Sequence, residues 1–79
     1  MCFKNYEIRQ LKNSLDFEVV CWNPASDSCY TVCFLRWQTD LYHLESVGMR
    51  IANHTHILPW LQYFVNYQES TNLLEGVDD

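Results

Sequence analysis

The sequence is poor in basic residues. It has five Lys or Arg against ten Asp or Glu, which gives a formal net charge of −5. All five basic residues lie before Ile51, and the chain from there to Asp79 carries none. Proteins that bind nucleic acid usually neutralise its phosphates with Lys and Arg. Unaided binding of nucleic acid is therefore disfavoured, and the acidic C-terminal part points to a basic surface on a partner.

Glycine, proline and long apolar runs are also scarce. Two glycines and two prolines occur in 79 residues, so neither a glycine-rich phosphate loop nor a low-complexity chain is expected. The N-terminal stretch carries Lys4, Glu7 and Arg9 and lacks the apolar run of a signal peptide. No stretch is apolar enough to predict a membrane span. We expect a cytoplasmic protein with no membrane association.

Apolar and aromatic side chains, in contrast, are plentiful. Hydrophobic residues make up 48% of the chain and aromatic residues 15%. A chain of this length buries only about 60–65% of its unfolded surface, so its core has to be dense in large apolar groups. We expect residues 1–79 to form a single small domain, with residues 70–79 as a flexible acidic tail.

Residues 16–37 have the pattern of a β-hairpin. DFEVVCW and CYTVCFLRW are rich in β-branched and aromatic residues, and NPASDS between them favours a turn. A loop over residues 23–28 would place Trp22 opposite Cys29.

Alternation along that hairpin predicts two different faces. One face is almost wholly apolar and would lie against the core; it comprises Phe17, Val19, Cys21, Tyr30, Val32 and Phe34. The other face is mixed and carries Trp22 and Trp37, with Cys29, Cys33 and Leu35 beside them.

Two further segments extend the expected sheet. CFKNYEIRQL near the N-terminus predicts a strand that precedes the hairpin, so the chain would form a meander. Residues 40–51 are ambiguous. They fit a strand with a bulge, or a short helix that Asp40 caps and Gly48 ends, and we favour the strand.

The clearest helix signal lies after residue 55. Apolar residues recur there with helical spacing, at Ile57, Trp60, Leu61, Phe64 and Val65. We expect a helix from about His56 to Ser70 with Thr55 as its N-cap. The predicted fold class is α+β, a three- or four-stranded antiparallel β-meander packed against one C-terminal α-helix.

The cysteines and histidines do not have the spacing of a metal site. The chain has no CxxC pair, and Cys29 and Cys33 on one strand would lie about 13 Å apart. His54 and His56 precede the helix and are interpreted as turn residues. We therefore predict no metal, no cofactor and free thiols. A Cys–His pair is possible by composition, yet no spacing selects one; we nominate no catalytic residue and expect no enzyme.

The remaining functional signal is a surface for a protein partner. Trp, Tyr and Arg are enriched at interface hot spots, and carboxylates on a helix would suit a basic site. The candidate partner-binding residues are Trp22, Arg36, Trp37, Tyr63, Tyr67, Glu69 and Glu75. The first hypothesis is a small acidic protein-binding module, in its most concrete form a phage-type inhibitor that blocks the nucleic-acid-binding site of a larger partner.

Two alternatives remain open. The chain would be a self-associating accessory or structural subunit if the second sheet face or an edge strand formed a homodimer. It would be a single-stranded nucleic-acid binder if the sheet aromatics served as stacking platforms.

Overall fold

The computed structural model describes the backbone of residues 2–77 and the side chains of residues 4–73. Expectations about Asp78, Asp79 and the side chain of Glu75 therefore lie outside the described residues. The strands are β1 (Cys2–Phe3), β2 (Tyr6–Gln10), β3 (Phe17–Asn23), β4 (Ser28–Gln38) and β5 (Leu41–Ser46). Two 3₁₀ turns, η1 (Arg50–Asn53) and η2 (Thr55–Ile57), lead into α1 (Leu58–Val77).

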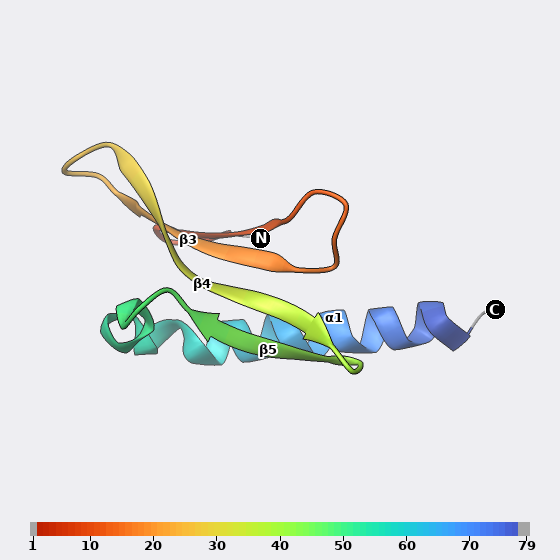
Figure 1. The fold of residues 1–79 in the computed structure, drawn as a ribbon. Coiled ribbons are helices and arrows are strands. Elements are labelled where there is room, and N and C mark those ends of the chain that lie inside the picture. The colour runs from red at the N-terminus through yellow and green to blue at the C-terminus, as the bar shows by residue number, and fades with distance from the viewer. Residues whose placement is uncertain (1, 78–79) are drawn as a thin grey trace.

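The strands form one antiparallel sheet in the order β1-β2-β3-β4-β5, so each pairs with its neighbour in the sequence. The predicted α+β meander with a C-terminal helix is confirmed (Figure 1). Only β1 was not expected as a separate strand. It consists of two residues and is divided from β2 at Lys4, whose φ is 51°.

The ambiguous segment is a strand from Leu41 to Ser46, as favoured, but the strand is shorter than expected and has no bulge: residues 47–49 form a turn, and Arg50–Asn53 form the 3₁₀ turn η1. A two-residue turn connects β5 to β4, with Gln38 paired to Leu41 and positive φ at both Thr39 (51°) and Asp40 (65°). Positive φ at both central residues is the geometry of a type I′ hairpin turn, which matches the natural twist of the strands.

The hairpin register is confirmed near the turn and wrong beyond it. Trp22 pairs with Cys29 and Val20 with Thr31, as expected, but Val19 pairs with Cys33 because β4 carries a bulge at this point. A bulge adds one residue to one strand, so every later side chain of that strand changes face.

The predicted faces of β4 therefore exchange their members after the bulge. Leu35, not Phe34, lies opposite Phe17 in the core and is 1% exposed. Cys33 is fully buried whereas Cys29 is exposed, so the expectation that these two thiols share a face is wrong.

The core lies between one face of the sheet and α1. The predicted helical stripe is confirmed, because Ile57, Leu61 and Phe64 are buried and Trp60 and Val65 pack against them. Their partners on the sheet are Tyr6, Ile8, Phe17, Val19, Cys21, Val32, Cys33 and Leu35.

The helix bounds differ from the prediction at both ends. Thr55 does not cap the helix; it begins the turn η2, and α1 starts at Leu58. The helix also continues past Ser70 to Val77. Its later turns dock on the sheet, since the side-chain amide of Asn72 donates to the hydroxyl of Tyr42 at 3.1 Å.

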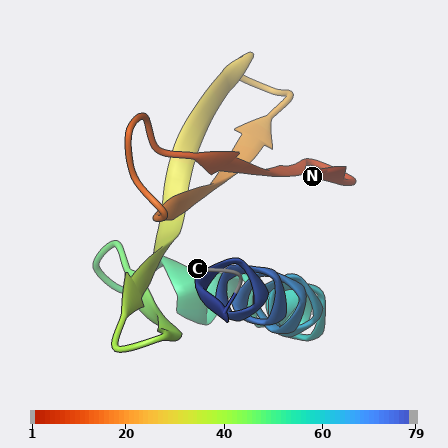
Figure 2. The ribbon, with the colours of Figure 1, turned by 90° about the vertical axis from the view of Figure 1, so that its right-hand side faces the viewer.

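The molecule is elongated, with extents of 48 × 22 × 21 Å. The sheet is strongly twisted and α1 lies on one side of it (Figures 1 and 2). Within residues 2–77, no helix has the length and apolar character needed to cross a lipid bilayer.

Candidate functional site: a groove beside an edge strand

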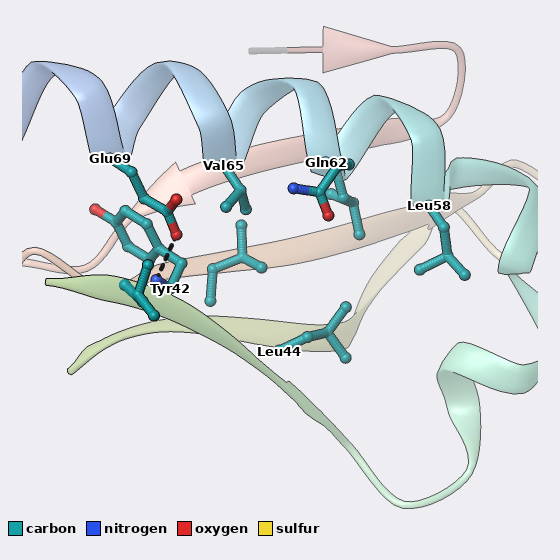
Figure 3. Close-up of a pocket in the computed structure, with 9 residues that line it drawn as sticks. Tyr42, Leu44, Leu58, Gln62, Val65 and Glu69 are labelled. Carbon is teal, nitrogen blue, oxygen red and sulfur yellow. Dashed lines mark hydrogen bonds between the residues drawn. The ribbon is translucent and has the colours of Figure 1, made fainter. Parts of the chain in front are cut away.

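An open groove of about 470 Å³ runs between β5 and α1. Figure 3 shows Tyr42 and Leu44 of β5 facing Leu58, Val65 and Glu69 of α1 across it. The complete lining is Leu35, Leu41, Tyr42, Leu44, Leu58, Leu61, Gln62, Val65 and Glu69. The lining is therefore mostly aliphatic, with one carboxylate. The volume of the groove is within the usual range for ligand sites.

The groove lies where α1 runs beside β5 without burying the side chains of that strand. The buried helix residues contact side chains of β2, β3 and β4, and no β5 residue belongs to the buried core. As a result Leu41, Leu44 and Leu58 remain 52%, 43% and 40% exposed. Three half-exposed leucines around one opening form a contiguous apolar patch, which is a feature of interaction sites.

β5 is also an edge strand, since it pairs with β4 alone. Val47, directly after it, donates its backbone N–H to the carbonyl of Val32 on the β4 side, whereas Tyr42 donates its N–H to a side chain of α1. Backbone groups of an antiparallel strand alternate in direction. Tyr42, Leu44 and Ser46 thus direct their N–H and C=O groups away from β4.

Glu69 closes one end of this edge. Its carboxylate Oε2 accepts the backbone N–H of Tyr42 at 2.8 Å (Figure 3). The Tyr42 hydroxyl in turn donates to the carbonyl of Leu15 at 2.9 Å. Burial raises the pKa of the Tyr42 phenol, and the nearby carboxylates of Asp16 and Glu69 add to the increase.

The predicted pair of interface tryptophans is not formed. Trp22 lies on the sheet face that α1 does not cover, paired with Cys29, and is 41% exposed. Trp37 lies on the helix side, paired with Tyr42, and the two ring centroids are 4.8 Å apart. The bulge in β4 separates the two tryptophans, because the expected common face assumed unbroken alternation.

The other candidate residues are also dispersed. Arg36 forms ion pairs with Glu45 (2.9 Å) and Asp16 (3.3 Å), so its guanidinium is engaged within the chain. Tyr63 and Tyr67 are 72% and 64% exposed and border a separate depression of about 330 Å³ on α1.

Of the candidate residues whose side chains are described, only Glu69 and Trp37 adjoin the groove. Glu69 lines it directly, and the Trp37 ring packs against the lining residue Tyr42 at an interplanar angle of 57°. The leucines that line the groove were not nominated from the sequence. Leu41 and Leu44 in an expected edge strand could have indicated an exposed apolar surface there.

A second polar cluster joins the turns before α1 to the sheet. The Tyr6 hydroxyl lies 2.5 Å from His54 Nδ1 and 3.1 Å from His56 Nε2, and the Tyr30 hydroxyl lies 2.8 Å from His54 Nε2. Arg50 lies over the Tyr30 ring at 5.5 Å. A neutral imidazole has one donor and one acceptor, so His54 donates to one tyrosine hydroxyl and accepts from the other.

This cluster favours its neutral form. Burial, followed by the proximity of His56, lowers the pKa of His54 below its usual value. Burial, with a contribution from Cys21, raises the pKa of Tyr6 to about 12. The hydrogen bonds of this cluster fasten the turn onto the sheet.

The described thiols and histidines do not assemble a metal centre. Among the side chains of residues 4–73, no three His, Cys, Asp or Glu come together with the geometry of a metal site. Cys21, Cys29 and Cys33 are free. Burial raises the pKa of Cys33 to about 11, which makes its thiol a poor nucleophile at neutral pH.

Comparisons of this chain with protein-family models, with curated proteins and with solved structures give no match. The groove therefore has to be interpreted from its own geometry.

Proposed function

We propose that this chain is a protein-binding module that takes up an extended segment of a partner along β5, with side chains of that segment in the groove below α1. The supporting observation is the position of an apolar groove directly beside an unpaired strand edge. Added strands gain affinity from main-chain hydrogen bonds and specificity from pockets for alternate side chains. The groove and the edge offer both contributions at one place.

The other hypotheses have less support. Glu69 is the one carboxylate of α1 among the described side chains, and a single carboxylate within a groove gives little support to a surface that mimics a row of phosphates. Trp22 is the only tryptophan on the uncovered sheet face of the described structure, which disfavours a stacking platform for single-stranded nucleic acid. An enzymatic role has no support from a described cluster of nucleophile, base and cavity.

A peptide selection tests the proposal. A random decapeptide library on phage is selected against the full chain, and selected peptides are measured by fluorescence anisotropy. We expect apolar residues at positions i and i+2, because alternate side chains of an added strand point to the same face.

A matched pair of variants locates the binding site. Leu44→Glu is expected to weaken binding by about 10- to 150-fold, since burying one leucine contributes roughly 1.5–3 kcal/mol. Tyr63→Ser, at an exposed aromatic residue outside the groove lining, should bind as the unmodified chain does. Equal binding by both variants would contradict the proposed site, and so would a selection without an alternating apolar pair.

A further inference from the structure

We infer that Glu69 acts as a latch on the edge of β5: its carboxylate holds the Tyr42 N–H until a partner segment displaces it. We further infer that this segment carries a Lys or Arg, which engages the displaced carboxylate. The inference rests on the proposed function of the groove and specifies the chemistry of its occupant. It is carried by the position of one charged group within an otherwise uncharged lining.

The carboxylate of Glu69 stands where the backbone of an added strand would be. Its Oε2 accepts the N–H of Tyr42 at 2.8 Å, and a sixth strand would supply a carbonyl oxygen for that N–H instead. The bond between Glu69 and Tyr42 thus blocks the edge against indiscriminate pairing, which is a recognised hazard of exposed strand edges. A segment that pairs along the whole of β5 has to displace the carboxylate.

Displacement leaves the carboxylate in an unfavourable position. Glu69 is only partly exposed, and the groove residues around it are Tyr42, Val65 and Gln62, none of them a cation. A charge that loses its hydrogen bond in a partly buried place is destabilised unless a new partner reaches it. A neutral segment would leave the charge uncompensated, whereas a segment with Lys or Arg at this end would replace the lost bond with a charge-assisted one.

The position of the basic residue follows from the direction of the groove. Glu69 and Tyr42 lie at the end near the β4–β5 turn, and Leu58 lies toward the other end (Figure 3). A segment that adds antiparallel to β5, as every other pair in the sheet does, runs toward Glu69. Its basic residue then follows the alternating apolar pair.

The lone carboxylate of the groove also disfavours a second copy of this chain as the occupant. β5 has the sequence LYHLES and contains no Lys or Arg. Pairing of two β5 strands would displace two Glu69 carboxylates without supplying a cation for either. A partner with a basic, partly apolar segment fits the charge of the site better than self-association does.

The test compares one selected peptide in two forms against three versions of the full chain. The peptide is used as selected and with its basic residue replaced by Gln; the chains are unmodified, Glu69→Gln and Asp27→Asn. The side-chain amide of the Glu69→Gln variant would keep an acceptor for the Tyr42 N–H but remove the charge. Asp27 lies in the exposed β3–β4 turn, so its variant removes the same charge away from the groove, and Asn tolerates its positive φ of 51°.

For the unmodified chain and Asp27→Asn, we expect the basic peptide to bind about 2- to 5-fold more tightly than its Gln form, the range of a modest, partly screened ion pair. For Glu69→Gln this preference should vanish, and the neutral peptide should bind at least as tightly as to the unmodified chain, because an amide is a weaker latch than a carboxylate. A purely structural role of Glu69 would instead weaken both peptides equally.

The outcomes separate the two levels of the proposal. Peptides that bind without preference for a basic residue overturn the latch and leave the groove as the binding site. A library that yields no peptide sensitive to Leu44→Glu overturns the proposed function itself. Concentration-dependent dimers that Leu44→Glu dissolves would show a second copy in the groove, which also overturns the inference.

Discussion

At the scale of single residues, the Tyr6 hydroxyl joins two histidines that precede α1. Together, neutral His54 and His56 can fill the hydrogen-bonding capacity of this hydroxyl, because it donates one hydrogen bond and accepts another. Two imidazolium rings would present only donors to the same oxygen. The cluster therefore stabilises the junction between sheet and helix best when at least one histidine is neutral.

The lowered pKa of His54 predicts a loss of stability in mild acid. The unfolded chain takes up a proton near pH 6.5, whereas the folded chain, with its lower pKa, resists it. The contribution of His54 is therefore complete above pH 6.5 and is lost as the pH falls from there through the folded pKa. Urea denaturation of the unmodified chain between pH 8 and pH 5 should show this decline.

Two variants assign the decline to its source. His54→Gln should lower the free energy of unfolding at pH 8 by about 1–3 kcal/mol through the lost hydrogen bonds, and should have a shallower pH dependence. His43→Gln, at an exposed position of β5, should retain the slope of the unmodified chain. If all three proteins lost equal stability on acidification, His54 would not be the titrating group.

At the scale of elements, α1 illustrates how burial depends on the side of a helix. Phe64 is 8% exposed and meets the Phe17 ring edge-on at 5.0 Å, whereas its neighbour Tyr63 is 72% exposed. Replacing each with Leu introduces the same side chain in two environments. Phe64→Leu should cost about 1–2 kcal/mol, because it reduces a packed aromatic contact.

Tyr63→Leu provides the internal comparison, and its free energy of unfolding should stay within about 0.5 kcal/mol of the unmodified chain. Thermal or urea unfolding followed by circular dichroism measures both. Equal costs at the two positions would mean that α1 does not present Phe64 to the sheet.

The same elements show which parts of the fold were predictable. The helical stripe and the Trp22–Cys29 register follow from local periodicity and turn residues, and both are confirmed. The bulge in β4 was not predictable, because CYTVCFLRW has apolar residues at both parities. Either alternation gives a plausible core face, and only packing against α1 selects Leu35 over Phe34.

The candidate site was largely hidden for a related reason. A groove depends on how far α1 covers the sheet, and no local pattern fixes that position. Glu69 was predicted as a partner-binding residue from its charge, but its bond to Tyr42 joins residues 27 positions apart. Composition predicted Trp and Tyr as interface residues, yet it cannot tell which face each one occupies once a bulge intervenes.

At the scale of the whole molecule, the net charge of −5 acts on any basic segment that approaches. Such attraction extends over about one Debye length, roughly 10 Å at 0.1 M salt, and mainly increases the association rate. The Glu69 contact is short-ranged and acts once the segment is bound, so it mainly slows dissociation. The two contributions should therefore respond differently to salt and to mutation.

Stopped-flow kinetics with a selected basic peptide can separate these contributions. Raising NaCl from about 20 to 500 mM should slow association roughly 3- to 10-fold and alter dissociation little, and the Gln form of the peptide should show a smaller effect.

Asp27→Asn changes the net charge from −5 to −4 far from the groove and should lower only the association rate. Glu69→Gln makes the same change in net charge but should also accelerate dissociation of the basic peptide. If these two variants had identical kinetics, the whole-molecule charge alone would account for the preference, and the carboxylate in the groove would have no separate role.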